Sequence, residues 1–171
     1  MADSQDDNPI KVGGALHHVT DRESPDKRSI LFEFTVQPSQ LPAVVEQLRQ
    51  KGKEASWAVF MFYTPNLSAE TDDNCPNLQF SIQDGTLGFD WVLLGPRNIA
   101  DEVRIAEFIA SKGHTVTEMG INDVEYLRVE DGDICELGLS IIEEFYKMPR
   151  DADIGILVSG FTLSIGGRHL H

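Results

Sequence analysis

Two strand-like segments joined by Asp84-Gly85 constrain the fold more than any other feature of this sequence. Residues 78–83 and 86–94 are rich in apolar and aromatic side chains, interrupted at intervals by polar ones, a pattern that favours strands. Asp-Gly is a preferred two-residue turn of type I′ because both central residues need a positive φ. The sequence therefore predicts a β-hairpin here, and with it an antiparallel sheet.

Strand and helix patterns alternate along the chain on either side of this hairpin. Further strands are predicted over residues 30–36, 57–63, 115–119, 124–129 and 154–163, and helices over 39–52, 98–113 and 133–148. The resulting order is β-α-β-β-β-α-β-β-α-β, which is neither strict βαβ alternation nor all-β. It predicts an α+β domain, a mostly antiparallel mixed sheet with helices packed on one face.

Each predicted helix carries an apolar stripe that we expect to face the core. The stripes are Leu41, Val44, Val45 and Leu48; Ile99, Val103, Ala106 and Ile109; and Ile134, Leu137, Ile141, Phe145 and Met148. Asn98 and Asp133 are expected to cap the second and third helices, with Glu136 completing a capping box with Asp133.

The polar segment 1–28 lacks sustained periodicity and is interpreted as a mobile or loosely attached arm. Residues 29–165 are predicted to form a single α+β domain, and residues 166–171 a frayed tail. The longest apolar run has seven residues, too few to cross a bilayer. The acidic N-terminus does not resemble a secretory signal, and two cysteines in a domain of this size are typical of reduced thiols, so we expect a cytoplasmic protein.

The chain is strongly acidic, with 28 acidic against 14 basic residues and a net charge of −14. Residues 118–153 contain eleven acidic and three basic residues, so this stretch alone contributes −8. Such a balance argues against a nucleic-acid partner and against docking on an anionic membrane, because both rely on clustered Lys and Arg.

Common catalytic and phosphate-binding motifs do not occur in the sequence: it contains no G-x-x-x-x-G-K-[ST], G-x-G-x-x-G, H-E-x-x-H, C-x-x-C or G-x-S-x-G. Cys135 lies in the first turn of the third predicted helix, but acidic neighbours disfavour its thiolate, so a small apolar role is preferred. Cys75 lies in a polar loop and is interpreted as an exposed thiol.

The histidines do not make a persuasive metal site. His17, His18, His169 and His171 fall in segments interpreted as mobile ends, and His114 is expected to bond the last carbonyls of the second helix. The acidic run 130–133 does not follow the spacing of a calcium loop and is interpreted as a turn and helix cap. We therefore expect no metal and no cofactor.

Two mid-strand carboxylates, Glu33 and Asp90, mark where a catalytic site would be sought. Asp90 interrupts an otherwise apolar strand, so it either faces solvent or is a buried acid with a raised pKa. Glu33, Asp90 and His114 are the candidate catalytic residues, although the balance of the sequence favours a protein that is not an enzyme.

The function predicted first is a binding or regulatory protein, such as an inhibitor or immunity-like protein, whose acidic face meets a basic protein partner. The expected partner-binding residues are Glu118, Asp123, Glu125, Glu130, Asp131, Glu143 and Glu144. Three alternatives remain open: a small-molecule enzyme or ligand-binding domain with a carboxylate-lined pocket, an oligomeric structural module, and an acidic surface that only aids solubility. The sequence does not determine the oligomeric state.

Overall fold

The computed structural model describes residues 34–64 and 75–171 of the chain. The predicted arm over residues 1–28, Glu33, His17 and His18 lie outside the described residues. None of the described helices is long and apolar enough to span a membrane.

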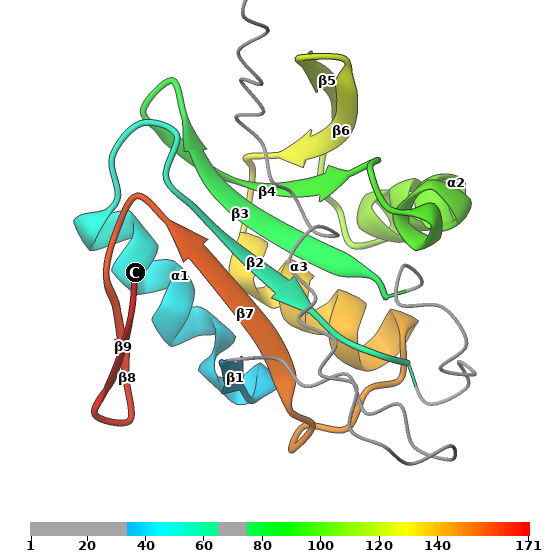
Figure 1. Ribbon diagram of the computed structural model, residues 1–171. Coiled ribbons are helices and arrows are strands. Elements are labelled where there is room, and N and C mark those ends of the chain that lie inside the picture. Colours follow the sequence, from blue (N-terminus) through cyan, green and yellow to red (C-terminus); the bar gives the residue numbers. More distant parts are fainter. Residues whose placement is uncertain (1–33, 65–74) are drawn as a thin grey trace, which may run out of the picture.

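Seven strands form one antiparallel sheet in the order β1-β7-β2-β3-β4-β6-β5 (Figure 1). They are β1 (Thr35–Val36), β2 (Trp57–Met61), β3 (Asn77–Gln83), β4 (Thr86–Val92), β5 (Thr117–Ile121), β6 (Val124–Val129) and β7 (Ile154–Ser159). The helices are α1 (Leu41–Lys51), preceded by the 3₁₀ turn η1 (Pro38–Gln40), α2 (Pro96–Ser111), and α3 (Ile134–Ser140), which continues as the π-helix η2 (Ile141–Phe145). The predicted α+β class and the antiparallel character of the sheet are confirmed.

The parallel component of the predicted mixed sheet is not found among the described strand pairs. β7 lies between β1 and β2 and is antiparallel to both. β1 and β2 therefore run in the same direction across α1 but do not pair with each other.

The β3–β4 and β5–β6 hairpins turn on residues that tolerate a positive φ. Asp84 and Gly85 have φ of 50° and 73°, and Gln83 pairs with Thr86, so the predicted β3–β4 turn is confirmed. The second hairpin turns at Asn122 and Asp123, with φ of 48° and 64°. β5 consequently begins and ends two residues later than predicted.

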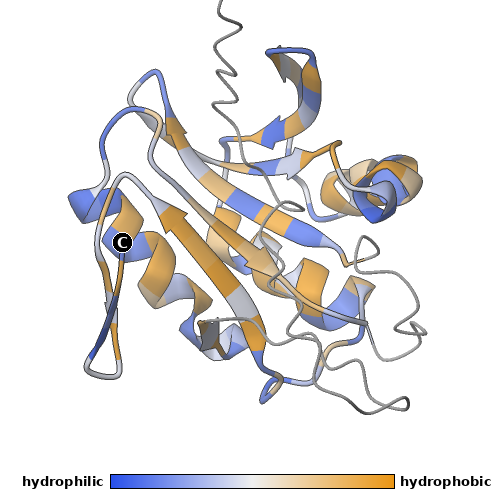
Figure 2. Cartoon of the chain, in the orientation of Figure 1, coloured by the Kyte–Doolittle hydropathy of each residue, from blue (hydrophilic) through white to orange (hydrophobic). Residues whose placement is uncertain are grey.

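The main hydrophobic core joins alternate residues of the strands to the buried sides of α1, α2 and α3. Leu41, Val44, Val45 and Leu48 of α1 are all 0% exposed, as their spacing predicts. They join alternate residues of the strands, among them Phe60, Phe80, Phe89 and Trp91. Figure 2 shows the apolar character of the neighbouring strands β7 and β2. Gly138 lets α3 approach closely, because a Cβ there would lie 2.8 Å from Phe80 Cζ.

The orientation of α2 differs from the predicted apolar stripe. Ile99 and Val103 are 52% and 67% exposed, whereas Asn98, Asp101, Ile105 and Ile109 are buried. The N-cap is Gly95, and Asn98 instead binds neighbouring strands: its Nδ2 donates to Val92 O (2.9 Å) and Asn77 O (3.0 Å), and its Oδ1 accepts from Asn77 N (3.1 Å). These buried polar contacts determine which side of α2 faces inward.

The π-turn in η2 changes which residues of the third helix are buried. Tyr146 N donates to Ile141 O (3.0 Å), five residues earlier. The extra residue rotates the later part of the helix by about 100°. Ile142 and Tyr146 are therefore buried, and Phe145, predicted to be in the core, is only partly covered. The predicted cap is present, since Asp133 Oδ1 accepts from Glu136 N (3.0 Å).

The end of the chain differs from the predicted long strand and frayed tail. β7 ends before Gly160, which has a φ of +82° and packs against Ser56. Leu163–Ile165 (β8) and Arg168–Leu170 (β9) then form a separate antiparallel hairpin. Gly166 and Gly167, with φ of 57° and 72°, allow this turn, so residues 168–170 are paired instead of frayed.

Candidate functional site

The sheet face opposite the core carries a row of buried polar side chains. Because residues alternate along a strand, Phe80, Phe89 and Leu127 point to the core, and their neighbours point away from it. Gln79, Asp90 and Arg128 are in register across β3, β4 and β6. Their exposed fractions are 7%, 0% and 3%, and Ser81 beside them is 4% exposed.

Asp90 and Arg128 form the centre of this polar cluster. Arg128 Nη1 donates to Asp90 Oδ1 (2.7 Å) and to Ser81 Oγ (3.0 Å). Ser81 Oγ donates to Asp90 Oδ2 (2.5 Å), and Gln79 Nε2 donates to the same oxygen (3.3 Å). Both carboxylate oxygens are thus occupied, as a buried charge requires.

Arg128 is held at its outer edge as well. Its Nη2 donates to Thr86 O (2.9 Å) and its Nε to Glu130 Oε1 (2.6 Å). Space for the guanidinium comes from Gly88, because a Cβ at that position would lie 2.6 Å from Arg128 Cζ. A side chain at Gly88 could be accepted only by displacing the ion pair.

Burial and pairing oppose each other at Asp90. Burial raises the pKa of the Asp90 carboxyl, while Arg128 and the hydrogen bonds from Ser81 and Gln79 act in the opposite direction. Of the two sequence-based alternatives for Asp90, the structure has the buried acid with a raised pKa.

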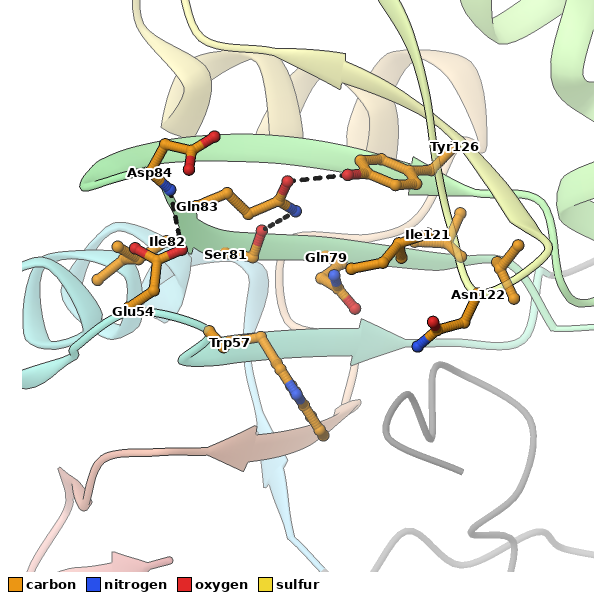
Figure 3. A pocket seen from close by; sticks show the side chains of 13 residues that line it. Glu54, Trp57, Gln79, Ser81, Ile82, Gln83, Asp84, Ile121, Asn122 and Tyr126 are labelled. Carbon is orange, nitrogen blue, oxygen red and sulfur yellow. Dashed lines mark hydrogen bonds between the residues drawn. The ribbon is translucent and has the colours of Figure 1, made fainter. Parts of the chain in front are cut away.

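A hollow of about 340 Å³ lies beside this cluster, between the sheet and the tip of the β5–β6 hairpin. Figure 3 shows Gln79, Ser81 and Gln83 along β3, with Trp57 on one side and Tyr126 on the other. Ile121, Asn122 and Val124 bring the hairpin tip to the same hollow. Asp90 and Arg128 do not line the hollow, but they contact the lining residues Gln79 and Ser81.

Of the three candidate catalytic residues, only Asp90 and His114 lie within the described residues, and each has its own partners. Glu33 lies outside the described residues. The His114 backbone N–H donates to Ile109 O (3.3 Å) in the last turn of α2, and its ring Nδ1 lies 2.8 Å from the carbonyl oxygen of Asp131. The predicted bond from His114 to the last carbonyls of α2 is therefore made by its backbone, while its ring contacts the loop that follows β6.

Four of the seven predicted partner-binding acids are occupied within the chain. Glu130 binds Arg128 (2.6 Å), and Glu144 binds Lys112 (2.5 Å), whose hydrogen bond lowers the pKa of Glu144. Glu143 is 3.2 Å from Arg150. Asp131 accepts from Thr115 N at 3.0 and 3.1 Å, and this backbone hydrogen bond lowers the pKa of Asp131.

The other three acids, Glu118, Asp123 and Glu125, belong to the β5–β6 hairpin, and among the described residues they form no ion pair. Every residue of β5 is exposed. Met119 and Ile121 of the same strand are 38% and 48% exposed, and β5 is an edge strand. The hairpin thus presents acidic and apolar side chains together.

The cysteines and C-terminal histidines lie apart from the hollow. Cys75 is 4% exposed and packs with Val59 and Met61, which corrects its expected exposure. Burial, followed by the charge of Asp133, raises the pKa of Cys135 to about 11. His169 Nδ1 and His171 Nδ1 lie 2.9 Å from Ser164 Oγ and Thr162 Oγ1. Across residues 34–64 and 75–171, no group of three or more His, Cys, Asp or Glu is placed to hold a metal ion.

A second buried acid, Asp101, was not among the candidate residues predicted from the sequence. Tyr146 OH donates to its Oδ2 (2.7 Å), and Arg97 Nε donates to the same oxygen (2.6 Å). Burial and the bond to Asp101 raise the pKa of the Tyr146 phenol, which keeps its proton on the donor. The contact joins α2 to the end of η2 and is a packing feature.

Gln79, Ser81 and Arg128 were not among the candidate residues predicted from the sequence. A signal was present in β3, where Gln79, Ser81 and Gln83 alternate with apolar residues. Pairing that polar face with Arg128 requires the β4–β6 register, which local sequence does not contain.

Comparison of the chain with protein-family models, with curated proteins and with solved structures found no match. Its function is therefore inferred from the geometry of its own residues.

Proposed function

We propose that the protein is a binding or regulatory protein, and that the β5–β6 hairpin is the surface that meets a basic protein partner. The observation that carries this proposal is the contrast among the acids. Glu118, Asp123 and Glu125 have no cation within the described residues. The other four acids already have partners in the chain.

Charge and apolar surface occur together on this hairpin, which favours an interface over a purely solubilising surface. Met119 and Ile121 add apolar area beside the acids. Unpaired acids steer a positively charged partner, whereas apolar contacts supply much of the affinity once water is excluded.

The free edge of β5 offers a further contact. β5 pairs with β6 on one side only, so the outward backbone groups can accept an added strand. A partner segment with extended backbone and Lys or Arg side chains would match both the edge and its charge.

Neutralising the hairpin acids tests the proposal. The variant Glu118→Gln/Asp123→Asn/Glu125→Gln is compared with Glu107→Gln/Asp151→Asn/Asp153→Asn, which removes the same charge at exposed positions outside the hairpin. A basic protein recovered at low salt with the unmodified chain is purified and titrated against both variants. The hairpin variant should bind at least tenfold more weakly and with a shallower dependence on salt, and the control should bind within twofold of the original.

Equal weakening by both variants would show that only net charge matters and would overturn the assignment to the hairpin. Light scattering of the unmodified chain tests the alternative structural role. A dimer that dissociates in the hairpin variant would show that the β5 edge serves self-association, and the proposal of a basic partner would then be wrong.

A further inference from the structure

We propose that the hollow between β2, β3 and the hairpin tip is a binding site for an organic cation, a guanidinium or amine carried on a short apolar stem. The inference stands on the hollow itself and does not require the hairpin proposal. Its starting point is Gln79, a buried side chain whose amide is only half satisfied.

The amide oxygen of Gln79 has no hydrogen-bond partner among the described residues, and the side chain is 93% buried, being 7% exposed. Its nitrogen donates to Asp90 Oδ2 (3.3 Å). Rotating the amide would place its oxygen against that carboxylate oxygen, which is unfavourable, so the orientation is determined by Asp90. A buried acceptor without a donor is rare in folded proteins, and Gln79 is one of the residues that line the hollow.

Three neighbouring polar groups on the floor of the hollow already direct hydrogen bonds elsewhere. Ser81 Oγ donates to Asp90 (2.5 Å), and Gln83 Nε2 donates to Ser81 (3.0 Å). Tyr126 OH donates to Gln83 Oε1 (2.8 Å), and burial raises the pKa of this phenol, so it keeps its proton for that bond. The oxygen of Gln79 therefore remains available to a ligand that brings a hydrogen-bond donor.

The charge around the hollow favours a positive ligand. Glu54 and Asp84 line the hollow, and none of the described residues around it is Lys, Arg or His. The nearby Arg128 is already paired with Asp90 and Glu130. Trp57 and Tyr126 offer aromatic surface, on which a guanidinium or ammonium group binds favourably.

The remaining wall is apolar, formed in part by Val92, Ile121 and Val124. A volume of about 340 Å³ is at the lower end of the range for small-molecule sites. Together these properties match a cationic head on a short aliphatic stem. Two sources share that chemistry: a free small cation, and an arginine or lysine side chain of a protein partner that contacts the hairpin tip.

Titration with N-acetyl-arginine methylamide and with agmatine tests the site, and N-acetyl-citrulline methylamide is the neutral control of nearly equal shape. Binding is followed by the fluorescence of Trp57, which is partly exposed, whereas Trp91 is fully buried, and by calorimetry. We expect dissociation constants on the order of 0.1–1 mM for the arginine compound or agmatine, and at least tenfold weaker binding of the citrulline compound. Equal binding of arginine and citrulline compounds, or no binding of either cation at 10 mM (about tenfold above the expected range), would overturn the proposal.

Two variants connect the binding to named residues. Gln79→Met retains side-chain volume and removes the acceptor, and Asp84→Asn removes an exposed charge while tolerating the positive φ of the turn. Both variants should weaken binding of the cation at least fivefold, whereas Asp151→Asn should leave this binding unchanged. Unchanged binding to a folded Gln79→Met protein, as judged by circular dichroism, would contradict the role of Gln79. Should Gln79→Met fail to fold, Asp84→Asn decides the matter in the same way.

The two sources of the cation, and the two proposals, are separated by crossing the variants. The hairpin variant should still bind agmatine, because its three acids do not line the hollow. If Gln79→Met weakens the binding of both agmatine and the basic protein, the cation that occupies the hollow belongs to the partner. If it weakens the binding of agmatine alone, the natural ligand is a free small cation. Failure of the hairpin proposal would leave agmatine binding unaffected.

Discussion

The Asp90–Arg128 pair allows a quantitative test of how this sheet is stabilised. Replacing Arg128 with methionine retains an unbranched apolar side chain but leaves Asp90, which is 0% exposed, without its cation. Ser81 and Gln79 would still donate to Asp90 Oδ2, but Oδ1 would lose its donor at 2.7 Å. Breaking a buried pair in this way costs about 3–5 kcal/mol of unfolding free energy, which is about 6–20 °C in Tm for a chain of this length.

The pH dependence identifies the cause of that loss. Burial already raises the pKa of Asp90 in the folded protein, and removal of Arg128 would raise it further. A raised folded-state pKa makes protonation favour the folded state, so the stability lost in Arg128→Met should be largest at neutral pH. It should be regained as the pH falls through the raised pKa towards the ordinary aspartate value, about 3.9.

Urea unfolding at pH 7.5 and pH 5, followed by circular dichroism, measures both effects. Arg150→Met is the matched control, since the Arg150 side chain is 84% exposed and its pair with Glu143 spans 3.2 Å. It should change the unfolding free energy by less than about 1 kcal/mol. An Arg128→Met protein within 1 kcal/mol (about one fifth to one third of the expected loss) of the original, or equally destabilised at both pH values, would refute the reasoning.

Three further outcomes follow from individual residues. Asn98→Ala leaves buried backbone groups of two strands unpaired and should cost about 2–3 kcal/mol in urea unfolding; a cost below 1 kcal/mol (the lower bound for one unsatisfied buried group) would contradict its role in placing α2. Ile99→Lys and Val103→Lys should each change that free energy by less than about 0.5 kcal/mol, because both side chains are mostly exposed, and a loss of several kcal/mol would show that this side of α2 is covered. Cys135, with a pKa of about 11, should be alkylated by iodoacetamide at a rate that still rises above pH 10, as read by peptide mass spectrometry; a plateau near pH 9 would indicate an ordinary thiol.

Local chemistry accounts for the parts of the fold that were predicted correctly. Asp84-Gly85 forms the β3–β4 turn because two consecutive positive φ values suit few other residue pairs. Asp133 caps α3 because its carboxylate reaches the N–H of Glu136 within one turn. The apolar spacing in α1 is unambiguous, and the buried residues are those it indicates.

Errors arose where a long-range contact outweighed a local preference. Asn98 is a residue type that is common at N-caps. Here its side chain instead donates hydrogen bonds to β3 and β4, and Ile99 and Val103 consequently face outward. In the third helix, a single π-turn moves Tyr146 into the core in place of Phe145. Neither outcome follows from periodicity, because each depends on what lies opposite the helix.

For the candidate sites as well, some features follow from the local sequence and others depend on long-range contacts. The excess of acids on residues 118–153 could be counted from the sequence, but which acids are occupied depends on neighbours such as Lys112, Thr115 and Arg150. The pairing of Asp90 with Arg128 joins residues 38 positions apart.

The sequence by itself therefore determined the β3–β4 turn, one helix cap, the α+β class and the negative charge, since these depend on residues a few positions apart or on composition. Only the tertiary structure decided the burial of Asp90, the unsatisfied oxygen of Gln79 and the hollow beneath the hairpin tip. Those features arise from the register of β3, β4 and β6, and a register between distant strands is selected by the packing of the whole sheet against its helices.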